Sequence, residues 1–166
     1  MTQRTRILIA VGLLVILVAL ILGIDALQRA GGEPATVGEP TVAPGAIPIR
    51  LDGKLVGSLT PSDLERLEKV SFVDTEEGKE QDGWLLRDVI RLYVDPENLA
   101  GVLVTVSSSS RDKSVRLTWD EVNRAENYVM FDLSNRGTLK LVSVLPSLDT
   151  RDEWVQDVDS IEVAHP

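Results

Sequence analysis

The chain has 166 residues, of which 26 are acidic and 17 are basic, so its formal net charge at pH 7 is −9. It contains no cysteine and a single histidine, His165. These counts exclude a disulfide framework, a thiolate metal cluster, a cysteine nucleophile and the usual Ser-His-Asp triad. The acidic balance also argues against nucleic acid as a partner, because a phosphate backbone is bound by an excess of lysine and arginine.

An apolar run near the N-terminus predicts a membrane anchor. Residues 7–24 contain no polar side chain, and we expect the transmembrane helix to occupy residues 7–27. At about 1.5 Å per residue, the apolar run spans roughly 27 Å, close to the hydrocarbon thickness of a bilayer. An uncleaved anchor is favoured over a secretory signal peptide, whose apolar region is shorter, because Asp25–Ala30 offers no clean small-x-small cleavage site. The lipid bilayer is therefore an expected partner.

The charges that flank this run predict its orientation. Arg4 and Arg6 precede it, whereas Asp25 and Arg29 cancel each other after it. The positive-inside rule places residues 1–6 in the cytoplasm and sends the remainder of the chain outside the cell membrane.

The chain beyond the anchor divides by composition. Residues 28–45 are rich in Gly, Pro, Ala and Thr, which predicts an extended linker, with a proline-rich protein-binding motif as the alternative. Residues 46–166 hold 14 basic and 23 acidic side chains and enough apolar residues for one core. We therefore expect an acidic extracytoplasmic domain over residues 46–166.

Hydrophobic periodicity predicts an α+β domain with mixed sheets. Helical spacing and capping residues indicate short helices after Thr60, over Leu85–Tyr93 and after Thr118. Apolar runs and alternation indicate strands, in chain order, at Ile47–Leu51, Lys54–Gly57, Val70–Val73, Val102–Val106, Ser114–Leu117, Tyr128–Leu133, Leu139–Leu145 and Ser160–Val163.

Three local signals are specific. Asp52-Gly53, between two strand patterns, predicts a type I′ hairpin turn. Thr60 with Asp63, and the segment Thr118–Glu121, each have the form of a capping box that opens a helix.

Several segments together resemble the molybdopterin-binding domain of the sulfite oxidase family, in a shortened version. They are Leu59–Leu64, Gly83–Ile90, Val104–Ser108, Val115–Val122 and Trp154–Val163. The resemblance implies a mixed-sheet α+β fold over most of Ile47–Val163.

The family's chemistry does not follow from this resemblance. Its enzymes bind molybdenum through the pterin dithiolene and one cysteine thiolate, and histidine and arginine side chains hold the cofactor. This chain has no cysteine, and His165 is its penultimate residue. No catalytic, cofactor-binding or metal-binding residue is carried over, and we expect a non-catalytic relative without a cofactor.

A polar stretch, Asp74–Gly83, is expected to be a solvated hairpin loop. Its carboxylates at Asp74, Glu76, Glu80 and Asp82 alternate in a way that suits Ca²⁺, which is the alternative. The loop is favoured because Gly78 stands where a ligand is needed, Lys79 would face the ion, and no Glu occupies the final ligand position.

A second polar segment, Ser107–Ser110, precedes Arg111 and Lys113. Such residues are ordinary turn material between two strands, and a small anion pocket of hydroxyls and cations is the alternative. A serine nucleophile is disfavoured, because the chain's single histidine is terminal.

Other conspicuous residues receive structural interpretations. Neighbouring carboxylates, Asp120 with Glu121 and Asp152 with Glu153, are rejected as acid–base pairs, because adjacency in the sequence does not make two side chains converge. His165 is expected to be exposed and frayed, without a role. Three tryptophans are expected to pack against the core: Trp84, Trp119 and Trp154.

These observations predict a membrane-anchored, non-catalytic binding or scaffolding domain, whose partner is a membrane or envelope protein. The alternative is a molybdopterin-binding oxidoreductase or an accessory subunit of one. A structural envelope protein with a helix-packing anchor is a third reading, but Gly12 and Gly23 are too far apart for a small-xxx-small motif.

Overall fold

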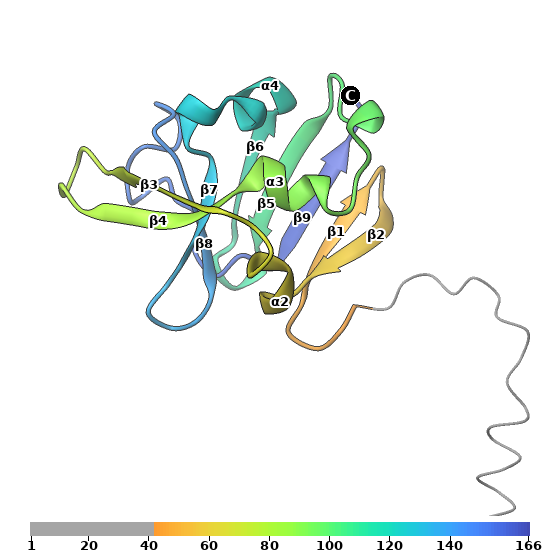
Figure 1. The fold of residues 1–166 in the computed structure, drawn as a ribbon, viewed down its shortest axis with the longest axis horizontal. Helices are drawn as coiled ribbons and strands as arrows, with labels where there is room; N and C mark the ends of the chain where they lie inside the picture. The colour runs from red at the N-terminus through yellow and green to blue at the C-terminus, as the bar shows by residue number, and fades with distance from the viewer. Residues whose placement is uncertain (1–41) are drawn as a thin grey trace, which may run out of the picture. The chain divides into compact units, whose positions relative to one another are not determined.

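The computed structural model describes residues 42–166 (Figure 1). The expected anchor at residues 7–27 and most of the expected linker at residues 28–45 lie outside the described residues. Within the described part of the chain, no helix is long and apolar enough to cross a membrane.

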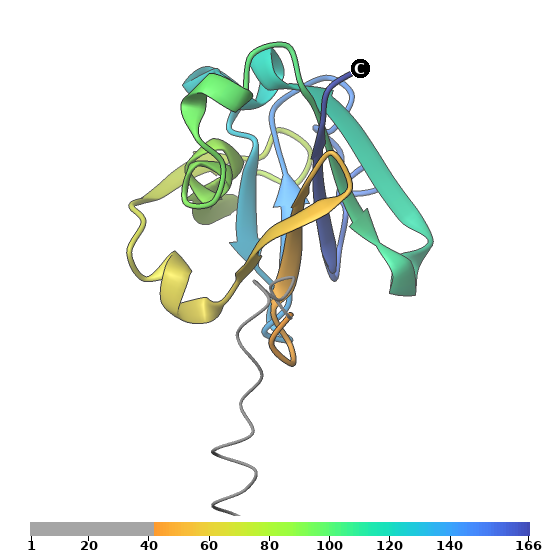
Figure 2. The same cartoon turned by 90° about the vertical axis from the view of Figure 1, so that its right-hand side faces the viewer.

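One sheet has five strands in the order β2-β1-β9-β5-β6. Strands β1 and β9 run parallel, and the other neighbours pair antiparallel. Figure 2 shows β1, β9 and the β5–β6 hairpin side by side. The strands are β1 (Ile47–Leu51), β2 (Lys54–Leu59), β5 (Leu103–Ser108), β6 (Lys113–Thr118) and β9 (Ser160–Ala164).

The other sheet has four antiparallel strands in the order β3-β4-β7-β8. They are β3 (Lys69–Val73), β4 (Glu80–Leu85), β7 (Met130–Leu133) and β8 (Leu139–Val142). The helices among the described residues are short: α2 (Pro61–Leu64), α3 (Leu86–Arg91) and α4 (Trp119–Asn123), with 3₁₀ turns η1 (Pro96–Asn98), η2 (Ser109–Arg111) and η3 (Ala125–Asn127). Mixed sheets with few helices confirm the predicted α+β class.

A shared core joins the two sheets. Ile49, Val104 and Ile161 of the five-stranded sheet are fully buried, as are Phe131 and Leu141 of the four-stranded sheet. All five belong to one hydrophobic cluster, to which α3 and α4 also contribute. Burial of this apolar surface is the main free energy that holds the sheets together.

The local signals in the sequence are confirmed. Asp52 and Gly53 both have positive φ, 49° and 78°, as a type I′ turn requires. The carboxylate of Asp63 accepts the Thr60 backbone N–H at 2.9 Å, and Glu121 closes the second capping box on the backbone N–H of Thr118 at 2.7 Å.

The structure corrects the expected loop over Asp74–Gly83. Its second half belongs to β4, which pairs with β3 on one side and β7 on the other. Glu, Gln, Asp and Gly are poor strand formers, so no local pattern signals this strand. Pairing with β3 extends residues 80–82, and β7 joins from Gly83 onwards. The hairpin loop is therefore limited to Asp74–Lys79, and the helix expected from Leu85 begins at Leu86.

Gly83 permits the close approach of β4 to β7. A Cβ atom at this position would overlap the backbone carbonyl of Phe131, which is held in the sheet. We predict that Gly83→Ala lowers the free energy of unfolding by about 3 kcal/mol or more, because neither backbone can move without breaking the pairing.

The matched control is Gly78→Ala in the β3–β4 loop, where φ is +66° and no atom lies within 4 Å of the added Cβ. Gly78→Ala should lower the free energy of unfolding by about 1–2 kcal/mol, because alanine disfavours the left-handed backbone conformation. Urea unfolding of the full chain in mild detergent, followed by tryptophan fluorescence, measures both. Equal losses in the two variants would contradict the packing described for Gly83.

Candidate functional site

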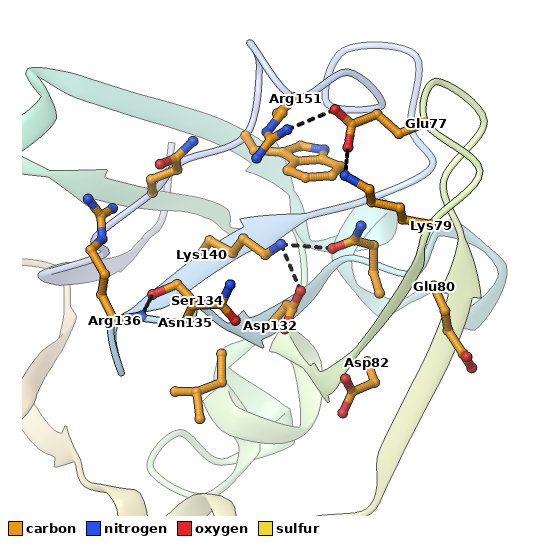
Figure 3. Close-up of a pocket in the computed structure, with 14 residues that line it drawn as sticks. Glu77, Lys79, Glu80, Asp82, Asp132, Ser134, Asn135, Arg136, Lys140 and Arg151 are labelled. Carbon is orange, nitrogen blue, oxygen red and sulfur yellow. Dashed lines mark hydrogen bonds and ion pairs between the residues drawn. The ribbon is translucent and has the colours of Figure 1, made fainter.

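A cavity of about 520 Å³ lies between the four-stranded sheet and a loop that packs beside it (Figure 3). Its walls are β4 with the preceding hairpin loop, the β7–β8 hairpin, and residues 149–157, which we call the 149–157 loop. Most lining side chains are polar or charged: Glu77, Lys79, Glu80, Gln81, Asp82, Asp132, Leu133, Ser134, Asn135, Arg136, Lys140, Arg151, Trp154 and Gln156.

Lys140 lies at the centre of this cavity (Figure 3). Its ammonium group is 2.8 Å from the Asp132 carboxylate and donates to the side-chain oxygen of Gln81 at 2.8 Å. The same ammonium lies 4.9 Å from the centroid of the Trp154 ring. The side chains of Lys140 and Asp132 are only 20% and 11% exposed. The pair is thus largely desolvated, and each charge has its partner.

Strand register brings these residues together. Asp132 and Lys140 face each other across the β7–β8 pair. Val155 of the 149–157 loop forms a bridge with Leu141 along the outer edge of β8. Because side chains alternate along extended backbone, Val155 and Leu141 turn to the core, while their neighbours Trp154 and Lys140 meet on the other face.

A buried carboxylate extends the network into the β3–β4 loop. Asp74 accepts from the Gln81 side-chain amide at 2.9 Å and from the Glu77 backbone N–H at 2.6 Å. The Glu77 N–H and the Gln81 amide lower the pKa of Asp74. The loop is therefore tied to Lys140 through Gln81.

This arrangement does not bring together the four carboxylates considered for Ca²⁺. Asp74 turns inward, Glu76 accepts the backbone N–H of Arg151 at 2.9 Å, and Asp82 pairs with Lys69 at 2.7 Å. Over residues 42–166, no group of three or more His, Asp or Glu side chains is placed to hold a metal ion.

Around the cavity, pairs of cations share single carboxylates. Glu77 contacts both Lys79 and Arg151, at 2.7 and 2.8 Å (Figure 3). Asp157 contacts both Arg111 and Arg136, at 2.7 and 3.1 Å. Each cluster therefore carries one more positive than negative charge.

A second cavity of about 220 Å³ adjoins the first and shares three of its residues: Arg151, Trp154 and Gln156. Its other lining residues are Arg111, Lys113 and Asp152. The cations considered for an anion pocket thus do line a cavity.

The serines considered with these cations do not line it. Ser107 and Ser108 belong to β5, and the hydroxyl groups of Ser108 and Ser110 lie 3.2 Å apart. Sequence reasoning missed Arg151, because it is far away in the chain and carries no local motif.

The three tryptophans pack as predicted, with exposed fractions below 10%. Each also has a cation near its ring: Lys69 at Trp84, Arg91 at Trp119 and Lys140 at Trp154. The indole N–H of Trp154 is buried and has no hydrogen-bond partner among residues 42–166. A buried donor left unpaired is uncommon in proteins, so this N–H is a candidate hydrogen-bond donor to a ligand.

One member of each rejected acid–base pair binds a backbone N–H three residues earlier in the chain. Glu121 caps α4, and the Glu153 carboxylate accepts the backbone N–H of Thr150 at 3.3 Å. The expectation that His165 is frayed is corrected. Its backbone N–H and its ring Nδ1 both contact the Asp52 carboxylate, at 2.8 and 3.0 Å, so the end of the chain is fastened to the β1–β2 turn.

Comparison with known proteins adds no family to this description. No protein-family model matches the chain, and a search of curated proteins finds no match.

Lys140→Met tests the central network. We predict a loss of about 3 kcal/mol in the free energy of unfolding, because the substitution leaves the buried Asp132 carboxylate without its cation. The control Lys54→Met, on an exposed lysine, should cost less than about 0.5 kcal/mol. Adding Asp132→Leu to Lys140→Met should restore part of the loss. Urea unfolding measures all three, and equal losses for the two lysine variants would refute the network.

Asp157 makes a pH-dependent contribution. The Thr138 hydroxyl and the Arg111 guanidinium hold the pKa of Asp157 below its ordinary value of 3.8. The stabilisation is therefore complete above that value and is lost as the pH falls through it towards the lower, folded-state pKa. We predict that the stability gap between the wild type and Asp157→Asn shrinks between about pH 5 and about pH 3.

Asparagine tolerates the positive φ of 54° at position 157, so the backbone is preserved. Asp120→Asn, which removes an exposed carboxylate, is the control for the loss of an acidic side chain and should change the free energy of unfolding at pH 7 by less than about 0.5 kcal/mol. A gap for Asp157→Asn that stays constant or widens on acidification would contradict the assignment. Urea unfolding at each pH gives the measurement.

Proposed function

We propose that this protein is a single-pass membrane protein whose extracytoplasmic domain, residues 46–166, is a binding module without catalytic activity. Residues 7–27 anchor it with residues 1–6 in the cytoplasm, and residues 28–45 form the linker. Its ligand site is the cavity around Lys140, and its partner is a membrane or envelope protein.

The observation that carries this proposal is the charged cavity with Lys140 held over Trp154. It is a preformed concave site that presents donors, acceptors and an aromatic side chain, as binding sites do. The unpaired, buried indole N–H of Trp154 lies beside it. Glu77, which lines the cavity, and Asp74 and Asp157, which adjoin its walls, all have lowered pKa values. General acid–base catalysis at neutral pH needs the opposite shift.

The proposed relation to the sulfite oxidase family is that of a shortened, non-catalytic relative. It rests on the sequence segments quoted above, and it implies the fold without the activity. Molybdopterin does not fit the residues present. The chain lacks the cysteine thiolate that would ligate molybdenum, and the described residues contain no substitute cluster of His, Asp or Glu.

Site-specific photocrosslinking tests the proposed function. Benzoylphenylalanine replaces Asn135, which lines the cavity, or Glu97, an exposed residue that does not line it. The full chain is illuminated with membrane extract from the source organism and weighed by intact mass spectrometry. We predict a discrete adduct at position 135 that is absent at position 97.

The adduct should also decrease several-fold in a Lys140→Met background whose fold is verified by circular dichroism. The same adducts at positions 135 and 97, or no adduct at position 135, would refute a binding role for this cavity.

A further inference from the structure

We infer that the smaller cavity binds an acidic side chain, Asp or Glu, of a partner polypeptide, through Arg111, Lys113 and Arg151. This inference rests on the proposed function, because the two cavities adjoin through Arg151, Trp154 and Gln156. A peptide lying in the larger cavity thus places a neighbouring side chain in the smaller one.

Hydrogen-bonding capacity is the first reason. A guanidinium group has five N–H donors and an ammonium group has three. Among the described residues, Arg111 uses its Nε–H on Asp157, and Arg151 uses one Nη donor on Glu77. Lys113 donates to the backbone carbonyl of Asp152. Most donors of these three side chains therefore have no partner among the described residues.

Charge is the second reason. Arg111 shares its carboxylate with Arg136, and Arg151 shares its own with Lys79. No carboxylate among residues 42–166 lies within ion-pair distance of Lys113, and Asp152 is the single acidic residue that lines the cavity. The side chains that line the cavity thus carry three positive charges and one negative charge, within a domain whose net charge is strongly negative.

The surroundings favour a carboxylate over a more highly charged anion. Asp152 at the cavity and the acidic domain both repel a dianion more strongly than a monoanion. The planar guanidinium groups already bind carboxylates in this domain, at Glu77 and Asp157. Trp154 provides an apolar surface for the methylene groups of a glutamate side chain.

The test measures binding of a defined probe to the full chain in mild detergent. The probe is the tripeptide Glu-Glu-Glu with acetylated and amidated ends, and the isosteric Gln-Gln-Gln peptide is the neutral control. Arginine Nε–H NMR signals report on binding. We predict that the acidic peptide shifts the signals of Arg111 and Arg151 and binds at least tenfold more tightly than the neutral peptide.

Variants separate this site from general charge attraction. Lys113→Gln and Arg151→Gln should each weaken binding of the acidic peptide about tenfold. Arg116→Gln removes an exposed arginine of β6 that does not line the cavity, and it should leave binding unchanged within twofold. Both lining substitutions are needed. Arg151→Gln also breaks the ion pair with Glu77, whereas Lys113→Gln removes a cation without breaking an ion pair.

Three results would overturn the inference: equal binding of the two peptides, an equal effect of the Arg116 substitution, or inorganic phosphate that binds more tightly than the acidic peptide. If the adduct at position 135 persists in such a case, the binding module stands and the acidic side chain alone is refuted. Loss of the adduct refutes the module itself.

Discussion

The arrangement of the site depends on one ammonium group, that of Lys140. It contacts Asp132 of β7, Gln81 of β4 and the ring of Trp154 in the 149–157 loop. Three segments that are distant in the sequence are thus fixed by one cation. Since a largely buried charge is stable only with its partners in place, the network either forms completely or costs several kcal/mol. It therefore fixes the shape of the cavity that it lines.

The distribution of charge around this centre distinguishes the site from the remainder of the domain. The chain has nine more acidic than basic residues, so each cation could in principle have a carboxylate of its own. Beside the 149–157 loop, however, two cations share Glu77 and two share Asp157. Lys79 and Arg151 lower the pKa of Glu77, and the Thr138 hydroxyl and the arginines lower that of Asp157, as expected for carboxylates that each bind two cations. The resulting surface suits recognition of a polar, acidic partner better than proton transfer.

The sequence predicts those features that depend on near neighbours in the chain. The Asp52-Gly53 turn and the two capping boxes follow from residues within four positions of each other, and the α+β class follows from periodicity. Strand β4 does not, because its polar residues are made extended by pairing with β3, and β7 joins it only from Gly83 onwards. The contacts of Lys140 with Gln81 and Trp154 likewise depend on segments that are distant in the sequence, and so does the placement of Arg111 and Arg151 at one cavity.

NMR detection of the lysine ammonium groups tests the central claim most directly. The chain has only five lysines, so a protected ammonium signal in the full chain labelled with ¹⁵N can be assigned by single substitutions. The account predicts one ammonium signal with slow hydrogen exchange and an upfield shift from the indole ring, which disappears in Lys140→Met. Rapid exchange of all five ammonium groups, or a protected signal that survives this substitution, would contradict it.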